Sequence, residues 1–342
     1  MAKHIISSCI ALSLLTTSPI RVATAAMAPQ TDPQTATTAA CPTFRWTTLG
    51  TAGGPIPTPE RTEPANLIEA GDQAILVDAG DAAASQLAKA GRLVGDVHTV
   101  FLSHLHLDHT GGLAAVVGLR WMNEYPGVIT IYGPPGTQAL VDGIIASMAM
   151  PAQMGFGLGL PSKPADRIKA VELTDGQVVE LGDLRVKAVA NNHLDGPGDF
   201  AKKAGALAFS YRFDMGDRSI TYTGDTGPDD RVTELATGSD MLVSEVIEVD
   251  QMIAMIAKQR PELADFMLNA AREHFTTHHV TPDEVGKIAA EAGVGRVVLT
   301  HYVIPGPLGE SAPSLYSQVR QHFSGEVDLS RDLSSYDVGC SR

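Results

Sequence analysis

The sequence is poor in cysteine and in long apolar runs, and each shortage excludes a class of protein. Three cysteines in 342 residues are too few for a disulfide-dense scaffold. No run beyond the N-terminal segment reaches membrane-spanning length without charges, so no association with a membrane is expected. The Gly-x-Ser-x-Gly elbow of many serine hydrolases is also missing.

Basic residues are outnumbered by acidic ones. The chain has 25 Lys and Arg against 39 Asp and Glu, for a formal net charge of −14, and no run of five or more basic residues. Such a surface repels polyanions, so we expect no nucleic-acid partner. A hydrophobic share of 44% with only 19% charged residues predicts a packed core in one large domain or two small ones.

The N-terminal segment has the three parts of a secretory signal peptide. A basic start at Lys3 precedes a largely apolar stretch over residues 5–15, and Ala23 and Ala25 supply small residues at a cleavage site. We expect a signal peptide over residues 1–25, a flexible leader over residues 26–43 and the folded domain over residues 44–342. The protein is then periplasmic or secreted.

Cysteine usage agrees with export. Cys9 leaves with the signal peptide, and Cys41 and Cys340 remain near the two ends of the mature chain. In an oxidising compartment, two remaining cysteines favour a disulfide that ties these ends together. Two unpaired thiols are the alternative, because the sequence does not supply the Cα separation that a disulfide requires.

Short β-type runs alternate with helical patterns along the rest of the chain. Strands are expected over residues 74–77, 99–102, 128–132, 184–189, 206–213 and 219–223. Helices are expected over residues 82–90, 137–148, 251–273 and 282–292, the last beginning at Pro282 after a Thr281 cap. Mixed strands and helices without a fixed-period repeat predict an α/β sandwich.

One segment concentrates the chemistry. Directly after an expected strand, His104, His106, Asp108 and His109 fall within six residues and are followed by Gly111 and Gly112. His104 and His106 are two apart, so an extended backbone points them the same way. Imidazole and carboxylate are the ligands that zinc takes when thiolates are absent. The segment therefore predicts a metal site.

The segment resembles the His-x-His-x-Asp-His motif of the metallo-β-lactamase superfamily, and other family elements follow in order. The strand end at Asp78 resembles the acidic residue that supports the metal loop. The resemblance implies an αβ/βα sandwich with two metal ions at one edge. The first ion would take His104, His106 and His193, the second would take Asp108, His109 and His301, and Asp225 would bridge both.

The ligand chemistry suggests two Zn²⁺ ions, with manganese or iron also compatible. Two such ions lower the pKa of a bound water and create a nucleophile near neutral pH. Asp108 can accept a hydrogen bond from that water and aim it, so we expect Asp108 to be catalytic as well as a ligand. No nucleophilic serine or cysteine is needed.

Residues 48–55, Glu245 and the segment 278–282 resemble the ribonuclease Z-like branch of the superfamily. In that branch a histidine before the last helix, oriented by a glutamate, donates a proton to the leaving oxygen. The resemblance assigns these roles to His279 and Glu245. The adjacent His278 leaves the assignment ambiguous by one residue, and His279 as a helix cap is the alternative.

The branch contains tRNA 3′-processing nucleases and secreted hydrolases similar to bacterial arylsulfatases. Export and acidic charge favour the second group, so we expect hydrolysis of a small anionic or aromatic sulfate or phosphate ester. A lactonase or other acyl hydrolase, a tRNA nuclease and a non-catalytic metal-binding module are the alternatives, and a homodimer is left open. Candidate anion-binding residues are Arg61, Asn66, Lys202 and Lys203.

Overall fold

The computed structural model describes residues 41–155, 162–195 and 203–340. The expected signal peptide and all but the last three residues of the leader lie outside these ranges and stay predictions. The described residues all belong to one compact unit, which begins at Cys41. Within the described residues, no helix is both long and apolar enough to cross a bilayer.

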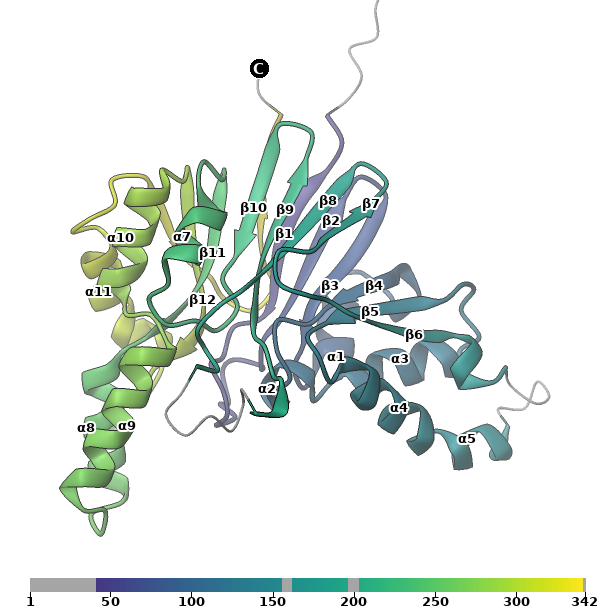
Figure 1. The fold of residues 1–342 in the computed structure, drawn as a ribbon, viewed down its shortest axis with the longest axis horizontal. Helices are drawn as coiled ribbons and strands as arrows, with labels where there is room; N and C mark the ends of the chain where they lie inside the picture. The colour runs from purple at the N-terminus through teal and green to yellow at the C-terminus, as the bar shows by residue number, and fades with distance from the viewer. Residues whose placement is uncertain (1–40, 156–161, 196–202, 341–342) are drawn as a thin grey trace, which may run out of the picture. The chain divides into compact units, whose positions relative to one another are not determined.

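Two seven-stranded mixed sheets form the centre of this unit (Figure 1). In spatial order, the first sheet contains β14 (Ser334–Asp337), β1 (Phe44–Gly50), β2 (Ala65–Ala70), β3 (Gln73–Ala79), β4 (Val97–Phe101), β5 (Ile129–Gly133) and β6 (Ile168–Glu172). The second contains β13 (Glu326–Leu329), β12 (Arg296–Val303), β11 (Met241–Ile247), β10 (Arg218–Tyr222), β9 (Phe209–Met215), β8 (Leu184–Ala190) and β7 (Val178–Leu181).

Helices cover the outer face of each sheet, which makes an αβ/βα sandwich (Figure 1). Between the strands β3 and β6 of the first sheet, the chain forms α1 (Ala83–Lys89), α2 (Leu107–Thr110), α3 (Leu113–Met122), α4 (Thr137–Ser147) and α5 (Ala149–Met154). The second carries α7 (Asp230–Ala236), α8 (Val249–Gln259), α9 (Asp265–His278), α10 (Pro282–Ala292) and α11 (Leu308–Val319). Single 3₁₀ turns occur at Val94–Asp96 and Pro164–Asp166.

Three apolar layers hold these elements together. Between the sheets, aromatic residues such as Trp46, Phe101, Tyr211 and Phe213 are completely buried. A second layer joins the first sheet to α1, α3 and α4, and a third joins the second sheet to α7, α10 and α11. Because both faces of each sheet are covered, its central strands are apolar on both sides. The expected α/β sandwich is confirmed.

The expected elements match the structure except in one helix. Residues 251–273 were expected to form a single helix, but α8 ends at Gln259 and α9 starts at Asp265. Pro261 lies between them, and its ring and missing N–H end a helix at the preceding residues. The result is a hairpin of two helices, seen beside the second sheet in Figure 1. By contrast, α10 starts at Pro282 with a Thr281–Glu284 capping box, as the sequence predicts.

The two ends of the domain are joined. Cys41 and Cys340 form a disulfide with a Cα–Cα distance of 6.0 Å. Next to it, β1 pairs with β14, and Arg45 donates to both oxygens of Asp337 at 2.7 and 3.1 Å. The disulfide is the alternative favoured by the sequence, and it links the start of β1 to the end of β14, the edge strand of the first sheet.

Candidate metal centre

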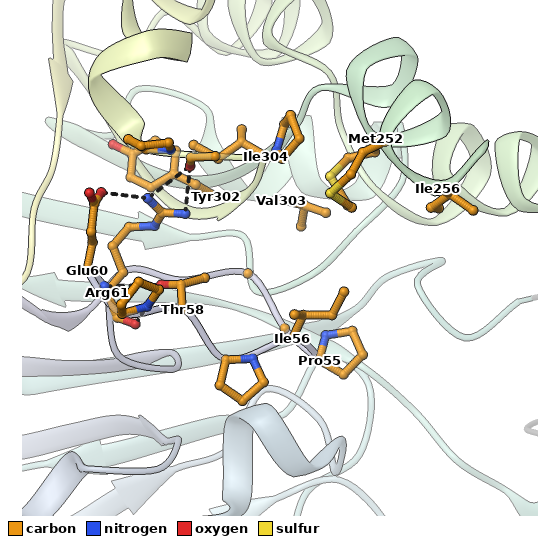
Figure 2. A pocket seen from close by; sticks show the side chains of 18 of the residues that line it. Pro55, Ile56, Thr58, Glu60, Arg61, Met252, Ile256, Tyr302, Val303 and Ile304 are labelled. Atoms are coloured by element: carbon orange, nitrogen blue, oxygen red, sulfur yellow. Dashed lines mark hydrogen bonds and ion pairs between the residues drawn. The ribbon is translucent and has the colours of Figure 1, made fainter. Parts of the chain in front are cut away.

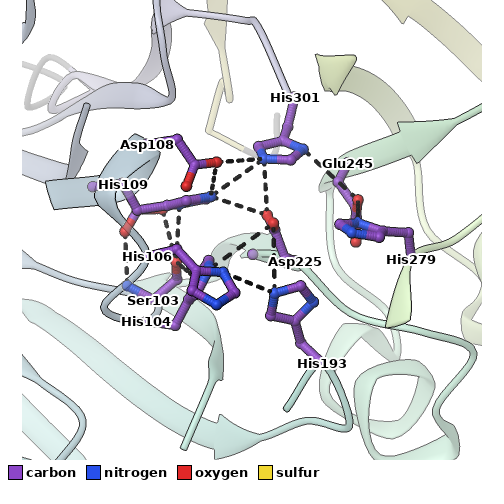
Figure 3. Close-up of polar contacts among 12 residues, drawn as sticks. Ser103, His104, His106, Asp108, His109, His193, Asp225, Glu245, His279 and His301 are labelled. Carbon is purple, nitrogen blue, oxygen red and sulfur yellow. Dashed lines mark hydrogen bonds and ion pairs between the residues drawn. The ribbon is translucent and has the colours of Figure 1, made fainter. Parts of the chain in front are cut away.

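The candidate ligands gather where parallel strands of both sheets end. The segment from His104 to His109 follows β4, and Asp78 lies near the end of β3 in the same sheet. From the second sheet, Asp225 follows β10 and His301 lies in β12. Carboxyl ends of parallel strands meet at one edge of a sheet, so this topology brings distant parts of the sequence together. Figure 3 shows the side chains converging.

The first group of ligands consists of His104, His106 and His193. Nε2 of His104 lies 2.9 Å from Nδ1 of His106, and Nε2 of His193 lies 3.3 Å from the same Nδ1. Oδ2 of Asp225 lies 4.0 Å from Nε2 of His104 and 3.9 Å from Nε2 of His193. His104 and His193 are buried, while His106 is exposed and marks the open side of the group.

The second group consists of Asp108, His109, His301 and the other oxygen of Asp225. Oδ1 of Asp225 lies 3.2 Å from Nε2 of His109 and 3.1 Å from Nε2 of His301. Oδ2 of Asp108 lies 3.4 Å and 3.7 Å from the same two nitrogens. Asp225 therefore stands between the groups and presents one oxygen to each (Figure 3).

The donor set fits metal ions. Ligands bound tetrahedrally to zinc at bond lengths of about 2.0–2.1 Å lie about 3.3 Å from one another, and the separations within each group scatter around that value. Oδ1 of Asp225 and Nδ1 of His301 are buried without a hydrogen-bond partner among the described residues. A buried carboxylate oxygen without a donor is costly unless a cation compensates it. Both groups therefore have the composition and spacing of cation sites.

Asp78 anchors the metal loop from behind. It accepts hydrogen bonds from the backbone N–H of Ser103 at 2.7 Å, from the Ser103 hydroxyl at 2.9 Å and from Nδ1 of His109 at 2.9 Å. Tyr222, from the opposite sheet, donates its hydroxyl to the same carboxylate at 2.9 Å. With Nδ1 of His109 donating to Asp78, Nε2 presents its lone pair to the second group. Sequence reasoning missed Tyr222, because only the sheet packing brings it to Asp78.

Two site residues adopt left-handed backbone conformations. Asp78 has φ of +59° and His301 has φ of +43°. Such values are uncommon in residues other than glycine, and they persist where the surrounding structure fixes them, often at functional sites. At both positions the backbone turns directly beside the ligand groups.

The electrostatics of the two groups differ. Burial lowers the pKa of His104 well below its usual value and that of His193 to about 3, so both are neutral ligands. Burial opposes ionisation of His301 too, but the charge of Asp225 and the hydrogen bond to Asp108 raise its pKa to about 9. Burial likewise disfavours the Asp108 carboxylate, yet His301 and His109 lower its pKa to about 2.

The structure separates the roles of the adjacent histidines. Nδ1 of His279 donates to Oε2 of the buried Glu245 at 2.7 Å, and one ring nitrogen of His279 lies within 4.8 Å of ligand atoms of His193 and Asp225. His278 turns away: its ring bonds to the backbone carbonyl of His193, and its own carbonyl accepts from Nδ1 of His193 at 2.9 Å. His279, the residue that directly follows α9, is therefore the one that faces the ligands.

Glu245 is held in place by more than His279. Its Oε1 accepts a hydrogen bond from the backbone N–H of Thr226 at 2.6 Å. Burial raises the pKa of Glu245, even though the charge of His279 opposes this shift. Burial also lowers the pKa of His279, but the charge and hydrogen bond of Glu245 outweigh it and leave that pKa raised. The pair favours a protonated imidazole next to the metal ligands.

Three of the four candidate anion-binding residues lie in the described part of the chain, and none of these three joins the ligand groups. Asn66 is buried in β2, and its amide donates to the Val77 carbonyl at 3.4 Å. Arg61 is buried beside Tyr302 in a separate cavity. Lys203 is exposed, and Lys202 lies outside the described residues. Sequence reasoning missed Glu63, a buried carboxyl whose raised pKa reflects burial and the nearby charge of Asp108.

Comparisons with known proteins identify the family. A family model described as a beta-lactamase superfamily domain matches residues 73–302. Ribonuclease Z from Mycobacterium avium (strain 104) is 32% identical over 300 residues, which cover 85% of this chain and 97% of that protein. The chain belongs to the metallo-β-lactamase superfamily. Ribonuclease Z from Mycobacterium marinum is 29% identical with similar coverage, and these relatives place the chain on the ribonuclease Z-like branch.

Solved structures support the same fold. A metallo-beta-lactamase fold protein from Bacillus subtilis, YhfI, aligns with a TM-score of 0.63 at 20% identity, covering 86% of this chain and 99% of that one. The short form of human tRNase Z aligns with a TM-score of 0.57 at 23% identity, covering 85% and 98%. The chain is a metallo-β-lactamase-fold hydrolase of ester bonds, and its His and Asp cluster can bind metal ions, typically zinc.

Two expectations drawn from the sequence are wrong. The curated relatives are ribonucleases Z, which point to a nuclease and contradict the expected arylsulfatase-like function, and a lactonase or other acyl hydrolase does not fit better. The exclusion of nucleic acid fails for the same reason. Net charge describes long-range attraction over the whole surface. It does not describe a site whose local positive charge comes from bound cations.

Proposed function

We propose that this protein is a zinc-dependent phosphodiesterase of the ribonuclease Z type that cleaves RNA. The observation that carries the proposal is the shared carboxylate of Asp225, whose two oxygens face two separate ligand groups. The ribonuclease Z relatives, which this chain matches over nearly their full length, support the substrate class.

In this proposal, His104, His106 and His193 would hold one zinc ion, Asp108, His109 and His301 would hold the other, and Asp225 would contribute to both. Two such ions would supply the Lewis acidity that activates water and neutralises charge on a phosphoryl group. The protein contributes rigid positioning. Nδ1 of His109 is fixed by Asp78 and Nδ1 of His193 by the His278 carbonyl, so each imidazole keeps its tautomer and orientation.

Asp108 has a second role, as an acceptor. Its carboxylate stays ionised because His301 and His109 lower its pKa to about 2. It is also only partly buried, in contrast to His109 and Asp225. An ionised carboxylate on the open side of the site can accept a hydrogen bond from the attacking water and orient its lone pair towards phosphorus.

His279 donates the proton that the leaving oxygen needs. Glu245 holds the ring through Nδ1 and keeps its pKa raised, so the other ring nitrogen carries a proton towards the site. Cleavage of the P–O bond then transfers this proton to the departing ribose oxygen, and the imidazole is left neutral beside Glu245. Glu245 acts through His279 and is a positioning residue.

Adjacent substitutions test this assignment. His279→Ala should lower kcat for cleavage of a labelled single-stranded RNA by about 10²–10⁴-fold, the usual contribution of a general acid. His278→Ala is the matched control, because it keeps the backbone carbonyl that fixes His193 and should change kcat by less than about tenfold. Equal losses in both variants would remove His279 from the proton-transfer role.

The function itself is tested on three substrates. The mature, zinc-loaded protein should cleave a precursor tRNA or a single-stranded RNA, and it should leave an aryl sulfate and an acyl ester intact. Gel analysis of end-labelled RNA reports the cut. Hydrolysis of the acyl ester or sulfate without any RNA cleavage contradicts the proposal.

We also propose that the protein works outside the cytoplasm, behind the signal peptide expected over residues 1–25. The Cys41–Cys340 disulfide supports this location, because disulfides persist in oxidising compartments. Fractionation of cells producing the full chain should find the processed protein outside the cytoplasm. Unprocessed protein confined to the cytosolic fraction would overturn the proposed location and leave the proposed chemistry untouched.

A further inference from the structure

A cavity of about 370 Å³ lies between the α8–α9 hairpin and the loop over residues 53–61. Figure 2 shows Pro55 and Ile56 on one side and Met252 and Ile256 of α8 on the other. Met255 and Phe275 complete the apolar wall on the helices. Small-molecule sites have volumes of about 300–1,000 Å³ and mostly apolar walls with a few polar groups, so this cavity has the size of one small ligand group.

The cavity wall is built on the same backbone as the ligand groups. Gly54, in the wall, packs so closely on Asp108 that a β-carbon at this position would collide with the carboxylate. Tyr302 and Val303, also in the wall, directly follow His301. The N–H of Gly53 donates to the Tyr302 carbonyl at 3.0 Å and joins the two wall segments. A group in the cavity is therefore a near neighbour of the metal centre.

The buried Arg61 lines the cavity, and its guanidinium makes only long polar contacts within the described part of the chain. Arg61 is only 7% exposed, and its Nε has no hydrogen-bond partner among the described residues. Its two terminal nitrogens lie 3.5 Å from the Gly306 carbonyl, and the nearest carboxylate, Glu60, is 3.9 Å away. In Figure 2 the guanidinium reaches towards the Tyr302–Ile304 segment. A buried guanidinium with such weak contacts has donors left for an acceptor.

The hairpin wall is anchored in the protein. Met252 and Ile253 of α8 pack with Val303, and Phe275 of α9 lies against this cluster. Ile56, which is 59% exposed, lies on the opposite wall. The cavity thus has a fixed apolar floor and an accessible apolar rim, which suits a flat group that enters from solvent.

We infer that this cavity is a base-binding subsite that holds one nucleobase next to the phosphodiester at the metal centre, an inference that rests on the proposed function. A nucleobase has apolar faces, which Met, Ile and Phe side chains cover well. It also has oxygen or nitrogen acceptors along one edge, which match the guanidinium fork of Arg61. Only an unpaired base can enter, so the subsite selects single-stranded RNA at the cut.

The test compares two substitutions on the hairpin. Met255→Trp fills the cavity, and Met267→Trp adds the same side chain at a 45% exposed position of α9 that is not one of the described lining residues. The first substrate is a short single-stranded RNA. The others are copies of the same strand, each of which lacks the base of one nucleotide next to the cleaved bond. Zinc content and melting temperature of both variants are measured, so that a folding defect is recognised.

Met255→Trp should raise KM for the intact RNA by about tenfold or more, as expected for a lost base contact. Met255→Trp should leave KM unchanged for the abasic strand that lacks the base held in the cavity. Met267→Trp should change KM for neither the intact nor the abasic strand. Arg61→Gln is the second variant, and it should reduce the preference for the intact strand over the abasic one, measured as the ratio of their kcat/KM values.

The outcomes separate the inference from the proposed function. If wild-type protein cleaves RNA but does not distinguish intact from abasic strands, or if Met255→Trp and Met267→Trp behave alike, the subsite is overturned and the nuclease stands. If the wild-type protein cleaves neither strand, the proposed function fails and takes the subsite with it. An equal rise in KM for intact and abasic strands also overturns the inference, because the base then contributes nothing.

Discussion

The two ligand groups share Asp225 but are built differently. The first consists of three histidines, of which His104 and His193 are kept neutral by burial. The second includes the carboxylate of Asp108, and Asp78 lies behind His109. Burial opposes ionisation of His301, but the charge of Asp225 and the hydrogen bond to Asp108 raise its pKa to about 9. The first group therefore offers neutral imidazoles, whereas the second combines imidazoles with ionised carboxylates that favour a positive charge. The two sites therefore differ in their dependence on supporting carboxylates.

The largest effect is expected when the shared ligand is removed. Asp225→Ala takes one oxygen from each group, so both zinc affinities and RNA cleavage should fall by more than the roughly 100-fold that loss of an outer-shell partner causes. Metal analysis after dialysis and a cleavage assay measure this. Asp240→Asn, at a carboxylate that accepts from Ser219 outside the cluster, is the control. Retention of both ions in Asp225→Ala would contradict the shared-ligand assignment.

A smaller and selective effect is expected at Tyr222. Tyr222→Phe removes the hydroxyl that donates to Asp78, which loosens the carboxylate that orients His109. Zinc affinity of the second group should fall by about 10- to 100-fold, while the first group keeps its affinity. Competition with a zinc-binding dye resolves the two affinities.

Tyr211→Phe is the matched control for that experiment. Tyr211 is also fully buried, but its hydroxyl donates to the Leu102 carbonyl at 2.7 Å rather than to Asp78. Both variants lose one buried hydrogen bond and about 1 kcal/mol of stability, so the difference between them reports on Asp78. Equal zinc affinities in the two variants would show that Tyr222 supports the fold alone.

The smallest effect on the metal centre is expected from the disulfide. Cys41→Ser with Cys340→Ser should lower the free energy of unfolding by about 2–4 kcal/mol, because the unfolded chain is no longer cross-linked. Zinc content and cleavage rate at 25 °C should be unchanged, since the disulfide joins the ends of the domain next to the β1–β14 pair. Denaturant unfolding and metal analysis check both statements. Loss of zinc from a variant that remains fully folded would contradict this expectation and show that the disulfide supports the metal centre.

The fold, and the set of side chains that gather at the candidate metal centre, could be predicted from the sequence because both depend on local patterns. The segment from His104 to His109 follows an apolar strand, and the family motif places His193, Asp225 and His301 in order. The sequence does not decide which of the adjacent His278 and His279 faces the ligands, because this depends on where α9 ends. It also missed the helix break at Pro261, and with it the shape of the α8–α9 hairpin.

Contacts between residues that are distant in the chain could not be predicted from the sequence. Tyr222 meets Asp78 only because the two sheets pack face to face, and the cavity beside Arg61 combines a loop, a hairpin and a strand end. The choice of substrate failed for a different reason. The net charge of −14 predicts no nucleic-acid partner, but it is a sum over the whole surface, whereas substrate binding depends on the local site.

The most direct test of the central claim is a zinc titration of metal-free protein, with RNA cleavage measured at each step. If two linked sites act together, the cleavage rate should stay low at one equivalent of zinc per chain and rise steeply as the second equivalent binds. Full cleavage at one equivalent, or intact RNA with two equivalents bound, would contradict a two-site phosphodiesterase built around Asp225.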